Sequence, residues 1–137
     1  MPLTTFRSFV DLLEAMTVTG VSRNYTKGPP LGATGVADCP AKFIRYPSAD
    51  EDRTTFGTQG GWPAFRTDVV IVVEPTGQNT APANFDATVD MMDNLSEALR
   101  ALTCIVKSKM RWNIRQTMEE VAGMQYWAVV ASVEGSG

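Results

Sequence analysis

Four acidic side chains near the middle of the chain are the group best placed, by type and spacing, to do chemistry. They are Asp86, Asp90, Asp93 and Glu97. Their spacing is that of one helical face. A carboxylate pair catalyses as acid and base only where a cleft tunes its proton affinities, and a metal site needs oxygen ligands from several directions. An exposed helix supplies neither unless another subunit completes the shell, so the pattern favours a solvated or subunit-facing surface.

Other catalytic patterns are weak or missing in the sequence. The chain has no histidine, which removes the commonest general base and metal ligand. Cys39 and Cys104 fit no metal-ligand spacing, so we expect two reduced thiols, with a disulfide as the open alternative. The glycine-rich run Gly57–Gly61 lacks the lysine and the helix start of a phosphate-binding loop. The sequence therefore predicts no enzyme and no cofactor.

Composition is that of one globular domain spanning residues 1–137. Hydrophobic residues make up 44% of the chain and charged residues 20%, and the net charge is -3. The twelve lysines and arginines are scattered, which disfavours a dedicated nucleic-acid binder. No long apolar stretch indicates a signal peptide or a membrane span, so we expect a soluble intracellular product.

Two segments have the apolar period of amphipathic helices. The first is Thr5–Met16, with Thr4 or Thr5 as N-cap. The second is Asn84–Leu102, with Asn84 as N-cap. Helical spacing in the second predicts a continuous buried stripe. That stripe comprises Phe85, Val89, Met92, Leu95, Leu99 and Leu102.

Five segments have strand-like patterns. They are Val21–Tyr25, Lys42–Tyr46, Arg66–Glu74, Met110–Thr117 and Met124–Glu134. The β-branched run in the third predicts a central strand covered on both faces, and the last two read as a hairpin. Two amphipathic helices need a shared apolar surface. We therefore expect an α/β two-layer sandwich, in which a mixed four- to five-stranded sheet carries both helices on one face.

Long loops rich in glycine and proline are expected at about residues 26–41 and 47–65. Structure-poor stretches of this length are uncommon in a small domain and are often functional. Here they either contact a partner chain or are mobile surface. Trp62 lies in the second loop beside a proline and is a candidate anchor for a partner.

The second half of the chain resembles a known family. A strand ending in Glu74-Pro75 is followed by a polar turn, the helix NFDATVDMMDNLSEALRAL and a closing aromatic strand. This pattern, over Arg66–Glu134, resembles the lambda-like tail terminator proteins of long-tailed bacteriophages. The resemblance implies a structural virion protein, assembled in the host cytoplasm. Such proteins form a hexameric ring that caps the tail tube, stops tail elongation and provides the head-joining surface.

The resemblance also implies partners. These would be further copies of the chain, the tail tube protein and head-tail connector or neck proteins. DNA would pass through the ring without specific binding, which a mildly acidic chain suits because negative walls do not grip phosphates. Whether the acidic helix faces that lumen or another subunit stays open.

A ring is built by contacts between different patches on neighbouring subunits. On this interpretation the two long loops and the sheet edges would make those contacts. Trp62 and Phe65 would be apolar anchors. The charged partners would be Arg45, Arg53 and Arg66.

Two other readings of the sequence remain. One is a different head-to-tail neck protein or a tail-completion protein of the same size and fold. The other is a small intracellular ligand-binding domain or enzyme, with a pocket between helices and sheet. That second reading predicts a cleft containing polar groups such as Arg115 or Glu119.

Overall fold

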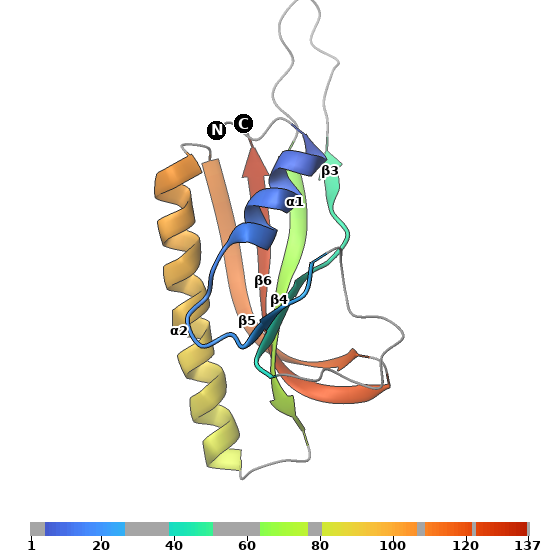
Figure 1. The fold of residues 1–137 in the computed structure, drawn as a ribbon, viewed down its shortest axis with the longest axis vertical. Coiled ribbons are helices and arrows are strands. Elements are labelled where there is room, and N and C mark those ends of the chain that lie inside the picture. The colour runs from blue at the N-terminus through green and yellow to red at the C-terminus, as the bar shows by residue number, and fades with distance from the viewer. Residues whose placement is uncertain are drawn as a thin grey trace, which may run out of the picture.

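The computed structural model describes residues 5–26, 39–50, 64–76, 81–106, 109–121 and 123–136. Two helices lie on one face of a six-stranded mixed sheet with the order β1-β2-β4-β6-β5, and β3 pairs with β4 (Figure 1). This confirms the predicted fold class, with more strands than expected. The elements are α1 Phe6–Ala15, β1 Arg23–Asn24, β2 Ala41–Ile44, β3 Ser48–Asp50, β4 Ala64–Pro75, α2 Ala81–Val106, β5 Lys109–Val121 and β6 Met124–Ser136.

The sheet is mixed because its strand pairs differ in direction. β1 and β2 are parallel, and all other pairings are antiparallel. α2 carries the chain from β4 across to β5, so these two strands run in the same direction with β6 between them. β5 and β6 form the predicted hairpin, and Gly123 in its turn has φ +84°, a backbone conformation that favours glycine.

β4 is the central strand, as its β-branched sequence predicts. Val69 and Ile71 pack on the helix side together with Leu95 and Leu99 of α2. Val70 and Val72 pack on the opposite side. β4 therefore contributes to two apolar clusters, one on each face.

On the face of the sheet that no helix in the described residues covers, here called the helix-free face, curvature of the sheet itself helps to bury an apolar cluster. Both strands of the β5–β6 hairpin bend strongly toward their shared turn (Figure 1). Val121 of β5 and Tyr126 of β6 thereby join Phe43 of β2 and Val72 of β4 in one cluster. Strong bending and coiling of a sheet lets strands bury apolar surface without a covering helix.

α1 begins at a reciprocal cap. Thr5 Oγ1 accepts a hydrogen bond from the Ser8 amide at 3.0 Å, and Ser8 Oγ accepts one from the Thr5 amide at 3.1 Å. Of the two predicted N-caps, Thr5 is thus the one used. Phe9 and Leu13 are fully buried, as the helical period predicts.

α2 begins earlier than the sequence predicts. It starts at Ala81, so Asn84 lies inside the helix and the prediction that it is the N-cap is wrong. Asn84 and Thr88 are both buried, and Thr88 Oγ1 donates to the Asn84 carbonyl at 2.7 Å. That local hydrogen bond lets a polar residue occupy a buried helical position.

The predicted apolar stripe of α2 is only half right. Leu95, Leu99 and Leu102 are buried, but Phe85 is 68% exposed and Val89 is 39% exposed. The helical period in this segment supports two neighbouring stripes, and the sheet covers the one that passes through Asn84 and Thr88. Periodicity alone could not choose between them.

Lys42 joins α1, β1 and β2 near the β1 edge of the sheet. β2 is buried throughout, and Lys42 is 1% exposed. Its Nζ donates to the carbonyls of Leu13, Met16 and Glu14 at 2.7, 3.1 and 3.3 Å, and to Asn24 Oδ1 at 3.4 Å. The last carbonyls of a helix lack intrahelical partners and attract positive charge. Lys42 therefore ties the end of α1 to β1 and β2.

A matched pair of substitutions on α2 tests which stripe is buried. We expect Leu95→Ala to lower the free energy of unfolding by roughly 2–5 kcal/mol, because it opens a cavity in the core. Val89→Ala should change it by no more than about 0.5 kcal/mol, since Val89 is exposed. Urea unfolding followed by circular dichroism measures both. Equal losses at the two sites would contradict the observed register.

Lys42 should make stability depend on pH in alkaline solution. Burial lowers the pKa of Lys42 from 10.5 to about 8, and the charge of Glu14 opposes this. Between these values the folded chain has released the proton while the unfolded chain keeps it, so raising the pH stabilises the folded state by up to about 3 kcal/mol. We expect wild-type stability, relative to Lys42→Met, to rise from pH 8 to 10.5 and to stay constant from pH 6 to 7. A flat or falling difference above pH 8 would refute this.

Candidate functional site

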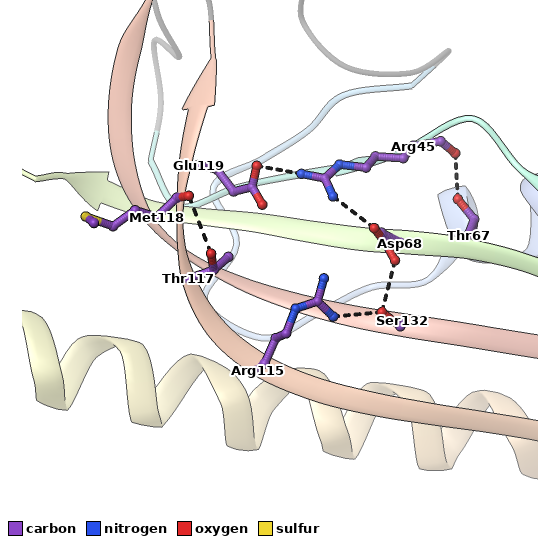
Figure 2. Close-up of polar contacts among 8 residues, drawn as sticks. All are labelled: Arg45, Thr67, Asp68, Arg115, Thr117, Met118, Glu119 and Ser132. Atoms are coloured by element: carbon purple, nitrogen blue, oxygen red, sulfur yellow. Dashed lines mark hydrogen bonds and ion pairs between the residues drawn. The ribbon is translucent and has the colours of Figure 1, made fainter.

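A polar network occupies the helix-free face of the sheet, toward the Ala64 end of β4. Figure 2 shows side chains from the end of β2, from β4 and from both hairpin strands pointing toward one another. Arg45, Asp68 and Ser132 line a shallow depression of about 540 Å³ beside this network, together with Arg66, Arg111 and Glu134. Its charged members alternate with core residues along each strand, so β4 presents Arg66 and Asp68 on this face while Phe65 points to the core.

Arg45 lies at the centre of the network. Its guanidinium donates to Asp68 Oδ2 at 2.9 Å and to Glu119 Oε2 at 2.5 Å. Burial disfavours the charge, but the hydrogen bonds to Glu119 and Asp68 outweigh it, so the pKa of Arg45 is raised above its ordinary value. Thr67 Oγ1 also donates to the Arg45 carbonyl at 2.6 Å.

The contact between Arg45 and Glu119 spans strands that are not neighbours. Arg45 follows β2 and Glu119 belongs to β5, with β4 and β6 between them in the sheet. The ion pair is possible only because the hairpin curves over this face. It therefore fixes the same curvature that buries the second apolar cluster.

Ser132 extends the network across the sheet. Its hydroxyl donates to Asp68 Oδ1 at 3.1 Å, and Arg115 donates to Ser132 Oγ at 2.7 Å. A second set of charged residues lies two residues further along the strands on the same face. Arg66 Nε donates to Glu134 Oε2 at 2.9 Å, and Arg111 of β5 is the register partner of Glu134.

The chemistry available here is charge recognition. Asp68 accepts from both Arg45 and Ser132, so its carboxylate is held between a cation and a hydroxyl group. Arg111 and Arg115 are exposed, and their remaining donors suit a carboxylate or another anionic group.

The structure places the predicted interface residues in different environments. Arg45 and Arg66 lie in the network, engaged in ion pairs within the chain. Phe65 is 1% exposed and packs against Phe9 with ring centroids 5.7 Å apart, so it is a core residue and not an exposed anchor. Trp62 and Arg53 lie outside the described residues.

The predicted loops are shorter than expected at the ends that can be described. Ala41 belongs to β2, residues 48–50 form β3, and β4 begins at Ala64. Residues 27–38 and 51–63 lie outside the described residues. Cys39 is half-buried against the second apolar cluster, and the side chain of Cys104 is outside the described part.

The acidic residues of α2 are all exposed, as predicted. They are Asp86, Asp90, Asp93 and Glu97.

Among the residues that the structure describes, no group of three or more acidic or cysteine side chains could hold a metal ion. No helix in the described ranges is long and apolar enough to cross a membrane.

Several members of the network were missed by sequence reasoning. Asp68, Ser132 and Glu134 were not singled out, although each is a polar residue at an alternate position of an apolar strand. That alternation could have predicted that the part of the sheet face around these residues is polar. The alternative reading, a ligand-binding domain or enzyme, predicts polar groups such as Arg115 or Glu119 in a cleft between helices and sheet, but both residues lie on the helix-free face.

Comparisons of the chain with protein-family models, with curated proteins and with solved structures find no match.

A double-mutant cycle on Arg45→Met and Glu119→Gln tests whether the ion pair holds the hairpin in place. We expect a coupling energy of roughly 1 kcal/mol, because the side chains are 35% and 20% exposed and water screens the pair only in part. The matched cycle on Arg66 and Glu134, which are 49% and 34% exposed, should give a smaller value. Chemical denaturation of the wild type and of the six variants, at low and high salt, supplies the data. Coupling that is no larger at Arg45 than at Arg66 would contradict a structural role.

Proposed function

We propose that the chain is a structural assembly protein of the tail terminator type. It would form a hexameric ring at the head-proximal end of a phage tail, cap the tail tube, stop its elongation and offer the head-joining surface. The sequence pattern over Arg66–Glu134 supports this assignment. The two-layer fold built on that segment is compatible with it.

The observation that carries the proposal is a pair of oppositely charged surfaces on one subunit. The helix-free face presents the exposed arginines Arg111 and Arg115 on the edge strand β5. The outer side of α2, which covers the other face, presents four exposed carboxylates. A ring grows by contact between two different and complementary patches, and these two surfaces supply such a pair.

The exposed edge of β5 adds to this support. β5 pairs with β6 on one side, and no described strand pairs with its other side. A free edge offers backbone amides and carbonyls to a neighbouring chain. Its arginines give such a contact a preferred partner, since they attract an acidic surface and repel another basic one.

The net charge of -3 suits a ring through which DNA slides without being gripped. On this proposal the partners are the tail tube protein and the connector or neck proteins, and the work requires no cofactor. A different neck or tail-completion protein is the second candidate, because the same charged surfaces would serve it. It would bind on the portal side and not at the end of the tube.

Negative-stain electron microscopy of the purified chain, alone and mixed with tail tubes, tests the proposal. We expect sixfold rings and tubes capped at one end. The variant Arg111→Gln/Arg115→Gln should lose ring formation, because it removes the positive surface. Arg7→Gln is the matched control, since Arg7 is an 82% exposed arginine on α1 and belongs neither to the β5 arginines nor to the α2 carboxylates. A monodisperse wild-type monomer that ignores tubes would count against the proposal.

A further inference from the structure

A second hollow lies on the other side of the molecule, between the first half of α2 and the β5–β6 hairpin. Its volume is about 530 Å³, within the range of roughly 300–1,000 Å³ typical of binding sites for small groups. The residues that define it are Asn84, Phe85, Val89, Met92, Gln116 and Trp127. It shares no lining residue with the polar depression on the helix-free face. We call it the α2 groove.

The walls of the α2 groove are unusually apolar for an exposed position. Phe85, Val89 and Met92 are spaced four and three residues apart, so they form one stripe along α2. Phe85 is 68% exposed and Val89 39% exposed. A contiguous apolar stripe left in water is typical of a contact surface.

Two buried polar atoms at the α2 groove lack hydrogen-bond partners in the described structure. They are Asn84 Oδ1 and Trp127 Nε1. Asn84 is 8% exposed, so its side chain is buried at the wall of the groove. Each unsatisfied group costs roughly 1–3 kcal/mol, which a ligand with matching atoms would recover. Phe85 and Met92 line the same hollow, and the unbranched side chain of Met92 adapts readily to a neighbouring group.

The outer rim of the α2 groove is acidic. Asp86 and Asp93 lie three positions before and four positions after Val89, so both neighbour it on the helix surface. Both carboxylates are exposed, and neither forms an ion pair with another described residue. The rim therefore attracts cations and repels phosphates.

We propose that the α2 groove binds an extended segment of another protein in which an apolar side chain is flanked by lysine or arginine. The apolar side chain lies against Phe85, Val89 and Met92. A backbone carbonyl of the segment accepts from Trp127 Nε1, and a backbone amide donates to Asn84 Oδ1. The flanking cations lie against Asp86 and Asp93.

The chemistry of the site selects this occupant over others. The interior of a helix satisfies its own amides and carbonyls, whereas an extended segment offers both along its whole length to Asn84 and Trp127. A nucleic acid is disfavoured by the acidic rim. The proposal does not use the arginine face, although it shares Asp86 and Asp93 with the acidic surface proposed for the ring.

Nuclear magnetic resonance on the full chain tests the proposal through the indole resonance of Trp127, assigned with Trp127→Phe. The probe is the peptide acetyl-Lys-Lys-Leu-Val-Lys-amide. One control peptide replaces each Lys with Glu, and the other replaces Leu-Val with Gly-Ser. We expect the probe to move the Trp127 resonance in a saturable way, and both controls to bind at least several-fold more weakly.

Variants of the protein separate the parts of the α2 groove. Asp86→Asn/Asp93→Asn should weaken binding of the probe roughly three- to tenfold, as expected for two exposed ion pairs. Phe85→Ser should weaken it further without unfolding the protein, since Phe85 is not in the core. Glu120→Gln is the matched control, because Glu120 is exposed on β5 outside the groove, and it should leave affinity unchanged.

Three results would overturn the proposal. The Trp127 resonance could stay fixed when the probe is added. The probe and the Gly-Ser peptide could bind equally, which would leave only non-specific attraction to the rim. The resonance could move on dilution of the protein alone, which would show that a second copy of the chain occupies the groove. The first two outcomes do not bear on ring formation, which electron microscopy measures independently, so failure of the groove proposal and failure of the ring proposal are distinguishable.

Discussion

Both faces of β4 are buried, and the rest of the fold is arranged to meet that condition. On one side α1 and α2 cover Val69 and Ile71. On the other side no described helix covers Val70 and Val72, so burial depends on the hairpin curving back over them. The ion pair from Arg45 to Glu119 bridges that curve. The polar network therefore stabilises the curved hairpin that buries the second apolar cluster.

Lys42 illustrates how the smaller helix is held. A buried ammonium is costly, and here three carbonyls at the end of α1 offset that cost. The helix end would otherwise lack hydrogen-bond partners, so each group satisfies the need of the other. This contact fixes the β1–β2 side of the sheet, and no strand in the described ranges pairs with the outer side of β5 at the opposite edge.

Strong local patterns made much of the fold predictable. The β-branched run of β4, the capped period of α1 and the turn at Gly123 each indicate one structure. The rotation of α2 was not predictable, because two adjacent stripes fit its period and only the sheet decides between them. The network was not predictable either, since Arg45 and Glu119 meet only after the hairpin bends.

The surfaces left after folding are what the proposed functions use. Arginines on β5 and carboxylates on α2 give the subunit two unlike sides, while the α2 groove between helix and hairpin is apolar. The central claim is that copies of this chain close into a ring on a tail tube. Counting fluorescently labelled chains on single tubes tests it most directly. A ring requires six copies at one end of each tube, and binding along the whole tube, or no binding, would contradict it.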